Sequence, residues 1–423
     1  MPGRSEFEPQ ATALDSRQRK VEDADGGRAR IEVYMLDLGC IVPYYTGPLC
    51  CNLKDQNVDV RLVSIAYHFD PEYFARNNLR PNSGIIDIVG KFGLRHRGIR
   101  KLLKAGEYVL NLAVLATRLI FKRPGLIHVQ YLALMEHAAL AERWFLGFVK
   151  KLGIRLVYTV HDQLPHDTGE RHKRKYARLY ATMDALICHT EQSKDRLVQD
   201  FSIDPKRIWV IAHGPLVLAP GAGRTQDAAR VKSGWAPGAC MVLCQGFIKP
   251  YKGLPFLLEA WQKVHASGAQ ARLVIAGTGE PQLLRQLEHQ AAALGVQSTV
   301  DLNFRFLSAQ EMGRLHEAAD ILVFPYKAIT MSGALMTGVS YRRAIVATRL
   351  PAFEQVLTDG ETGILIDYGD VDGLASALLR LIKDPVERSR LGAATAMLEA
   401  KYSWTEIAVE TKRCYQATMC GDR

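Results

Sequence analysis

The chain has 423 residues, too many for one ordinary hydrophobic core, and this length suits two domains of roughly 150–200 residues each. It is 48% hydrophobic and 23% charged, which is ordinary for a soluble globular protein. The net charge of +10 favours an anionic partner such as a phosphate, a nucleotide, a nucleic acid or a lipid surface, without choosing among them.

The first 29 residues are polar and mixed in charge, and they predict a disordered lead. They hold no apolar segment of the kind that a signal peptide needs. No later run approaches the roughly 20 apolar residues of a membrane-spanning helix. The 8 cysteines form no CxxC pair and are expected to be reduced core residues, which favours a cytoplasmic protein.

From residue 30 onward, short β-branched or aromatic runs alternate with amphipathic segments. This alternation is typical of an α/β fold in which helices cover both faces of a parallel sheet, and it predicts a first Rossmann-like domain over 30–218. The expected strands of this domain are 30–38, 58–67, 125–132, 154–162, 184–190 and 208–214.

One segment of this domain, 91–121, joins a strongly basic first half to a long apolar second half. It has two interpretations. The segment can be an ordinary pair of amphipathic helices with a solvated face. It can also be a surface that lies on anionic lipid, because basic charge beside a large apolar face is what interfacial binding requires.

A stretch rich in Gly, Pro and Ala follows, and we place a domain linker at 219–239. The alternation then resumes and predicts a second Rossmann-like domain over 240–405 and a C-terminal helix over 406–423. Ligands of such sheets bind beyond the carboxyl ends of the strands, so the residues just after each strand are the candidates for a site. The expected strands of the second domain are 240–247, 271–280, 299–306, 321–326 and 344–348.

Two strand ends of the second domain suit a diphosphate. The loop "GFIKPYKG" starts at Gly246, carries Lys249 and Lys252 and leads into a helix, although it could also be a solvent-facing basic turn. In "ITMSGALMTG", Ser332 can cap a helix and Gly333 leaves its first amides unobstructed. We expect both strand ends to face one crevice.

A third loop, "AGTGE", contains Gly277 and Gly279, which would let backbone approach a ligand. A plain tight turn is an equal alternative for this loop. It does not match GxGxxG, and the chain has no GxxxxGK[ST], so neither the NAD fingerprint nor the Walker loop is indicated.

In the first domain, "TVHDQLPHD" places His161, Asp162 and His166 at a strand end, where they suit hydrogen bonding to a polar substrate. One alternative is that these side chains form hydrogen bonds only within the core or the turn. A metal site completed by His189 and His213 is another, but no HExxH or other zinc spacing occurs, so we predict no metal ligands.

Several motifs in matching order resemble a known family. The first half carries "IHVQY", "TVHDQLPHD", "CHTEQSKDRL" and "VIAHG"; the second carries "GFIKPYKG", "LVIAGTGE", "LHEAADILVFPY" and "RRAIVATRLPAFEQVLTDGETGILID". Over roughly residues 30 to 410 the chain resembles the group-1 (family 4) retaining glycosyltransferases of GT-B fold.

The resemblance implies two domains that face across a cleft, with a nucleotide-diphosphate sugar on the C-terminal domain and the acceptor on the N-terminal domain. It implies transfer of a hexose with retained configuration, independent of a metal and with no cofactor. A glycan or lipid-linked acceptor in surface or exopolysaccharide biosynthesis would place the enzyme in the cytoplasm, on the inner face of the membrane. No aromatic-basic interleaving supports a nucleic-acid partner.

Individual positions carry over from the family as follows. Lys252 matches the lysine that holds the donor diphosphate, and His161 matches the histidine that faces the transferred sugar. Gly277 and Gly279 match the loop under the nucleotide. Glu354 lies where the family closes the donor pocket, and Asp162 and His166 are expected on the acceptor side.

The chain departs from the family at three places. Phe247 stands where an Arg is common, and Lys249 could supply the missing charge. Ile329 and Thr337 stand where the family often has two Glu eight residues apart. This departure motivates one alternative, a catalytically silent scaffold or partner subunit. A second alternative is other GT-B chemistry, such as an epimerase or a phosphorylase.

Overall fold

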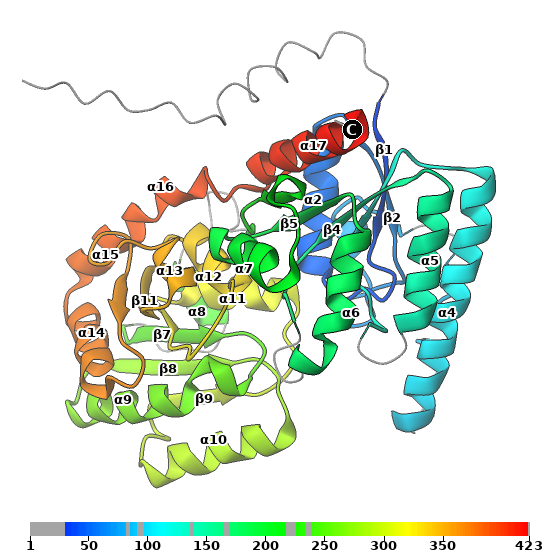
Figure 1. Cartoon of the computed structure of the whole chain (residues 1–423). Helices are drawn as coiled ribbons and strands as arrows, with labels where there is room; N and C mark the ends of the chain where they lie inside the picture. The colour runs from blue at the N-terminus through cyan, green and yellow to red at the C-terminus, as the bar shows by residue number, and fades with distance from the viewer. Residues whose placement is uncertain are drawn as a thin grey trace, which may run out of the picture.

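The computed structural model describes residues 30–81, 85–90, 97–135, 139–164, 169–216, 226–232 and 238–421. Two α/β domains lie side by side, each built on a parallel six-stranded sheet (Figure 1). The expected fold class is therefore confirmed.

The first sheet has the strand order β2-β1-β3-β4-β5-β6, and all its pairings are parallel. Each expected strand is present but shorter at its ends, where the chain enters loops. The strands are β1 Glu32–Leu36, β2 Asp59–Val63, β3 Leu126–Val129, β4 Arg155–Thr159, β5 Ala185–Cys188 and β6 Ile208–Val210. The helices are α2 Pro43–Asp55, α3 Tyr73–Arg76, α4 Arg97–Phe121, α5 Ala139–Lys151, α6 Gly169–Thr182, α7 Glu191–Phe201 and the 3-10 turn η1 Pro205–Arg207.

The second sheet has the order β12-β11-β10-β7-β8-β9. Its five expected strands are present, together with β12, which has only three residues and so shows too little pattern to predict. The strands are β7 Cys240–Gln245, β8 Ala271–Ala276, β9 Val300–Asn303, β10 Ile321–Phe324, β11 Ala344–Thr348 and β12 Ile364–Ile366. The helical elements are α8 Gln226–Lys232, η2 Pro250–Lys252, α9 Leu254–Ala266, α10 Pro281–Ala293, α11 Ala309–Ala318, α12 Gly333–Ser340, α13 Pro351–Glu354, α14 Val371–Lys383, α15 Pro385–Ala394, α16 Ala396–Glu399 and α17 Trp404–Cys420.

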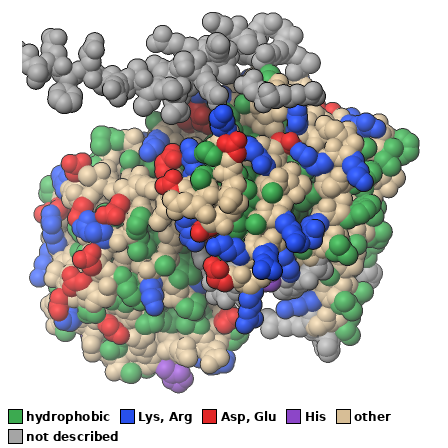
Figure 2. Space-filling model, viewed as in Figure 1, with side chains coloured by type: hydrophobic (Ala, Val, Ile, Leu, Met, Phe, Trp, Pro, Cys, Tyr) green, Lys and Arg blue, Asp and Glu red, His purple; other side chains and the backbone are tan. Residues whose placement is uncertain are grey.

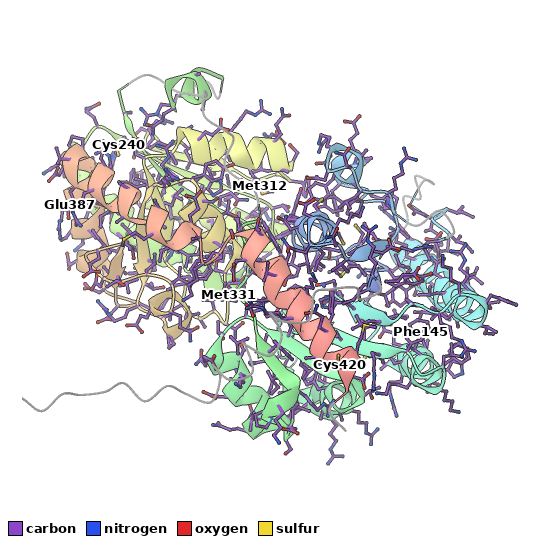
Figure 3. The ribbon with its side chains drawn as sticks, turned by 90° about the horizontal axis from the view of Figure 1, so that it is seen from above. Phe145, Cys240, Met312, Met331, Glu387 and Cys420 are labelled. Atoms are coloured by element: carbon purple, nitrogen blue, oxygen red, sulfur yellow. The ribbon has the colours of Figure 1, made fainter. Side chains whose placement is uncertain are left out.

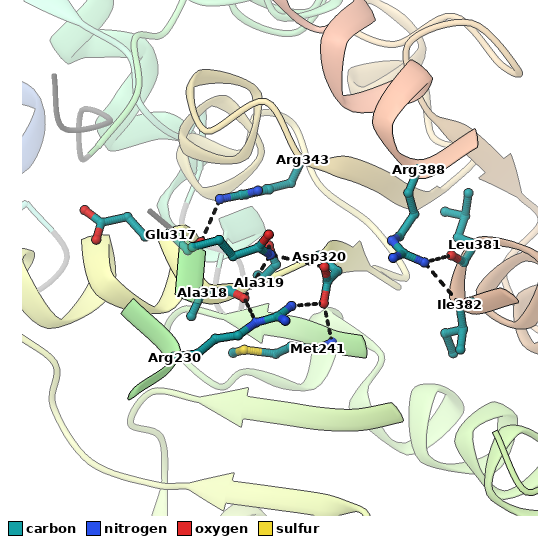
Figure 4. A network of polar contacts seen from close by, with 11 residues as sticks. Arg230, Met241, Glu317, Ala318, Ala319, Asp320, Arg343, Leu381, Ile382 and Arg388 are labelled. Carbon is teal, nitrogen blue, oxygen red and sulfur yellow. Dashed lines mark hydrogen bonds and ion pairs between the residues drawn. The ribbon is translucent and has the colours of Figure 1, made fainter. Parts of the chain in front are cut away.

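The segment that we predicted to be a linker contains the helix α8, which is bonded to the second domain (Figure 4). Arg230 forms an ion pair with Asp320 and donates from Nε to the Ala318 carbonyl at 3.2 Å. Asp320 in turn accepts the amide of Met241, the second residue of β7, at 2.7 Å. Composition alone did not indicate this helix, because its contacts are made with residues about 90 positions away.

The C-terminal helix α17 leaves the second domain and packs on α2 of the first (Figures 1 and 3). Trp404, its first residue, donates from Nε1 to the Pro215 carbonyl at 2.9 Å. Near its end, Tyr415 is fully buried, with its hydroxyl 2.6 Å from Nδ1 of His128 on β3. The helix thereby links the end of the chain to the strand ends of the first domain. Among the described helices, none is long and apolar enough to span a bilayer.

Candidate functional site

A cleft of about 430 Å³ lies between the carboxyl ends of the two sheets. Each sheet contributes the point where its strand order reverses, β1 beside β3 and β7 beside β10, and such switch points are where ligands of doubly wound sheets bind. The first domain lines the cleft with residues that include Cys40, Val42, Tyr45, Phe69, His161 and His213. The second domain lines it with residues that include Gly246, Phe247, Lys252, Gly277, Ser332 and Gly333.

Lys252 is the buried cation of this cleft. Only 7% of its surface is exposed, and its Nζ donates a hydrogen bond of 2.7 Å to the Tyr326 hydroxyl. The same Nζ lies 4.6 Å from the centre of the Tyr326 ring. Burial lowers the pKa of the Lys252 ammonium, because a charge removed from water is disfavoured. An anion in the cleft would offset the desolvation of the ammonium by attracting its charge, so this lysine is suited to bind a phosphate group.

Two glycines allow the backbone crossings that hold Lys252 in place. A Cβ on Gly253, at φ +65°, would lie 1.9 Å from the Pro325 carbonyl oxygen. A Cβ on Gly277, at φ +145°, would lie 2.0 Å from the Gly246 carbonyl oxygen. The ends of β7, β8 and β10 can therefore approach one another only where no side chain intervenes.

Ser332 caps α12 as expected: its hydroxyl accepts the Leu335 amide at 3.2 Å. Gly333 lies against the first domain, since a Cβ there would be 2.9 Å from His213 Cε1. Thr337, which stands where the family often has an acid, accepts the Leu216 amide at 2.9 Å from that domain. This position therefore joins the two domains, and Ile329, the other unusual position, lines the cleft.

His161 faces the second domain from the end of β4 and is half-buried. Its Nε2 lies 3.2 Å from Oε1 of Gln130, which only accepts, so Nε2 carries the proton. The Tyr45 ring meets the imidazole edge-on at 4.7 Å between ring centres. Burial, and then the neighbouring imidazoles, lower the pKa of His161 well below its usual value, so the ring is neutral.

The predicted site residues divide into two groups. Six of them line the cleft: His161, Gly246, Lys252, Gly277, Ser332 and Gly333. In the described part of the chain, the lining does not include Lys249, Asp162, Gly279 or Glu354, and the roles of these four stay predictions. His166 falls outside the described residues.

Two of these four residues are exposed. Lys249 is exposed where it precedes η2. Glu354 is exposed on α13, with its Oε1 3.6 Å from Nη1 of Arg349.

Sequence reasoning missed the aromatic residues of the cleft. Tyr326 follows β10 in "ILVFPY" and could have been noted as a polar group at a strand end. Phe69 and Phe306 come from different domains and stack at 4.8 Å between ring centres. No local signal indicates such a pair, because it depends on how the domains meet.

Comparisons with known proteins agree with this geometry. The model of the family described as "Glycosyltransferase Family 4" matches residues 44–214, and that described as "Glycosyl transferases group 1" matches 239–384. Together they match well over half of the chain. This chain belongs to the group-1 glycosyltransferases.

Among the curated relatives of this glycosyltransferase is a D-inositol 3-phosphate glycosyltransferase from Corynebacterium efficiens, 26% identical over 277 residues. The match covers 62% of this chain and 65% of that protein.

Two solved structures show the same GT-B fold. Anabaena HepE in complex with UDP-glucose has a TM-score of 0.70 at 15% identity, over 92% of this chain and 100% of that one. WaaG, a glycosyltransferase involved in lipopolysaccharide biosynthesis, has a TM-score of 0.62 at 14% identity over the same shares.

Proposed function

We propose that this glycosyltransferase moves a hexose from a UDP-sugar to a hydroxyl of a glycan acceptor, with retention of configuration. The observation that carries the proposal is the buried Lys252 ammonium, held in the cleft beside the start of α12 and facing His161 across the domains. A similar fold in HepE is known in complex with UDP-glucose, which supports this donor class.

Leaving-group stabilisation is the chemistry that these residues suit. As the bond between the sugar and the diphosphate breaks, negative charge grows on the phosphate oxygens. Lys252 and the first free amides of α12 would stabilise that charge most in the transition state. They would do so without a metal ion at the diphosphate.

The lining of the cleft bears on the route by which configuration would be retained. In the described part of the chain the lining contains no Asp or Glu, so the covalent route through a carboxylate nucleophile lacks its residue. We infer attack on the sugar from the face that the diphosphate leaves. The His161 ring would form part of the cleft wall that faces the transferred sugar.

A panel of nucleotides and sugar donors tests this proposal by two measurements, thermal unfolding and nucleotide release. Thermal unfolding with UDP, GDP and ADP should show the largest rise in Tm with UDP, because a ligand that binds only the folded state stabilises it. Nucleotide release from each UDP-sugar, with and without a crude lipid-glycan acceptor, should then require the acceptor.

Each rival function predicts a different outcome of this panel. A silent subunit would release no nucleotide from any sugar donor. An epimerase would release free nucleotide without an acceptor, and a phosphorylase would require inorganic phosphate. An inverted product by NMR would contradict retention.

We further propose that the acceptor is lipid-linked, for surface or exopolysaccharide biosynthesis, and that the enzyme binds the cytoplasmic face of an anionic membrane. The support is an apolar stripe on α4 at the outer edge of the first domain (Figures 1 and 2). Exposed Ile99, Leu102, Leu103, Leu110 and Phe121 recur along one face of it over about six turns. Leu102 is 75% exposed and Phe121 is 85% exposed.

Basic and aromatic groups adjoin this stripe. Arg100 and Lys101 are exposed on the same helix. On the neighbouring α5, Leu140 and Trp144 are exposed, at 78% and 57%. An apolar stripe beside basic charge is the combination that inserts into the interface of an anionic bilayer.

The double variant Arg100→Glu/Lys101→Glu should bind vesicles of anionic lipid about tenfold or more weakly than the wild type, because each basic residue near such a surface contributes about 1 kcal/mol. Co-sedimentation measures this. Lys263→Glu/Arg285→Glu makes the same charge change on α9 and α10 and should leave binding unchanged. Equal binding by both double variants would contradict the membrane proposal.

A further inference from the structure

Three histidines from neighbouring strands converge at the border of the cleft. His161, His189 and His213 follow β4, β5 and β6, which are adjacent in the first sheet. One ring nitrogen from each lies within 4.8 Å of the other two. The sequence holds them 28 and 24 residues apart, so no compact metal motif indicates the cluster.

In each ring, the other nitrogen is already fixed by an oxygen that only accepts. Nδ1 of His189 lies 2.9 Å from the Ile211 carbonyl, and Nδ1 of His213 lies 2.5 Å from the Gly214 carbonyl. Nε2 of His161 lies 3.2 Å from Gln130 Oε1. These nitrogens therefore carry the protons, and the remaining nitrogens (Nε2 of His189, Nε2 of His213 and Nδ1 of His161) present lone pairs.

One of these lone pairs is buried without a donor. Nε2 of His189 is buried and has no hydrogen-bond partner among the described residues. A buried acceptor without a donor costs free energy, and ring nitrogens of three histidines within 4.8 Å of one another suit a shared electrophile.

We propose that these three imidazoles bind a divalent transition-metal cation of the zinc class at the border of the cleft. Neutral imidazoles are common zinc ligands, and an outer N–H bonded to an oxygen is the usual arrangement that orients them. At a Zn–N distance of about 2.0–2.1 Å, tetrahedral ligand atoms lie roughly 3.3–3.4 Å apart, so the rings would move inward by about 1 Å.

The cation would tie together the ends of three strands and hold His161 toward the second domain. His213 also contacts Gly333 there, since a Cβ on Gly333 would lie 2.9 Å from His213 Cε1. The proposed role is structural: it fixes one wall of the cleft, and sugar transfer itself needs no step at the cation.

The experiment measures metal directly in tag-free protein, so its result does not depend on the proposed activity. After incubation with ZnCl₂ and gel filtration, we expect about one zinc per chain by elemental analysis, and a higher Tm than after chelator treatment. His189→Ala should lose this zinc. His289→Ala, which removes an exposed histidine on α10, should keep it.

A second measurement covers the case in which His189→Ala does not fold. Co²⁺ added to the wild-type protein should give the visible bands of a low-symmetry imidazole site, and Zn²⁺ should displace it. The proposal is overturned if the wild type holds no stoichiometric zinc, if His189→Ala holds as much as His289→Ala, or if the Co²⁺ spectrum is that of the free ion.

Discussion

Replacing Lys252 with methionine is expected to lower the rate of sugar transfer by about 10²–10³-fold, the usual effect of removing one preorganised charge donor from a transition state. Methionine keeps much of the buried volume of the lysine stem, so the loss reports the ammonium group rather than a cavity. Because Lys252 is buried beside Tyr326, no solvent cation can take its place. Initial rates with saturating donor and acceptor measure the effect, and UDP should also raise the Tm of the variant less than that of the wild type.

Two further lysine variants separate this role from general charge effects. Lys263→Ala removes an exposed lysine that pairs with Asp372 on the outer surface, and it should leave the rate unchanged. Lys249→Ala should have a smaller effect than Lys252→Met, since Lys249 is exposed and does not line the described cleft. Near-full activity of Lys252→Met would contradict its assignment to the diphosphate.

Replacing Gly253 with alanine is expected to destabilise the protein by about 3–4 kcal/mol and to abolish the rise in Tm with UDP. The substitution combines a left-handed backbone at φ +65° with a methyl group 1.9 Å from the Pro325 carbonyl oxygen. Relief of that overlap must separate the Lys252 loop from the end of β10. Urea denaturation and thermal unfolding with UDP measure the two effects.

Gly295 offers a matched control in the same domain. Its φ is +68°, almost that of Gly253, but no atom lies within 4 Å of an added Cβ. Gly295→Ala should therefore cost only the backbone strain, about 1–2 kcal/mol, and UDP should stabilise it as much as it stabilises the wild type. Equal effects of the two substitutions would show that the crossing at Pro325 does not position the lysine loop.

The amino-acid sequence by itself indicated the two sheets and several residues that line the second domain's side of the cleft. Short β-branched runs between amphipathic segments encode a parallel sheet locally, and the same local signals placed Lys252 and Ser332 after strands. A strand end and a helix cap are properties of a few consecutive residues. They can therefore be inferred before any fold is known.

Only the tertiary structure decided which strand-end residues meet. The strand pairings bring His189 and His213 beside His161, and the return of α17 over α2 carries the last helix to the first domain. Domain packing brings Thr337 against the first domain, where its hydroxyl accepts the Leu216 amide. The physical reason is that such contacts join residues far apart in the chain, and their geometry follows from sheet order, twist and domain packing rather than from any local pattern.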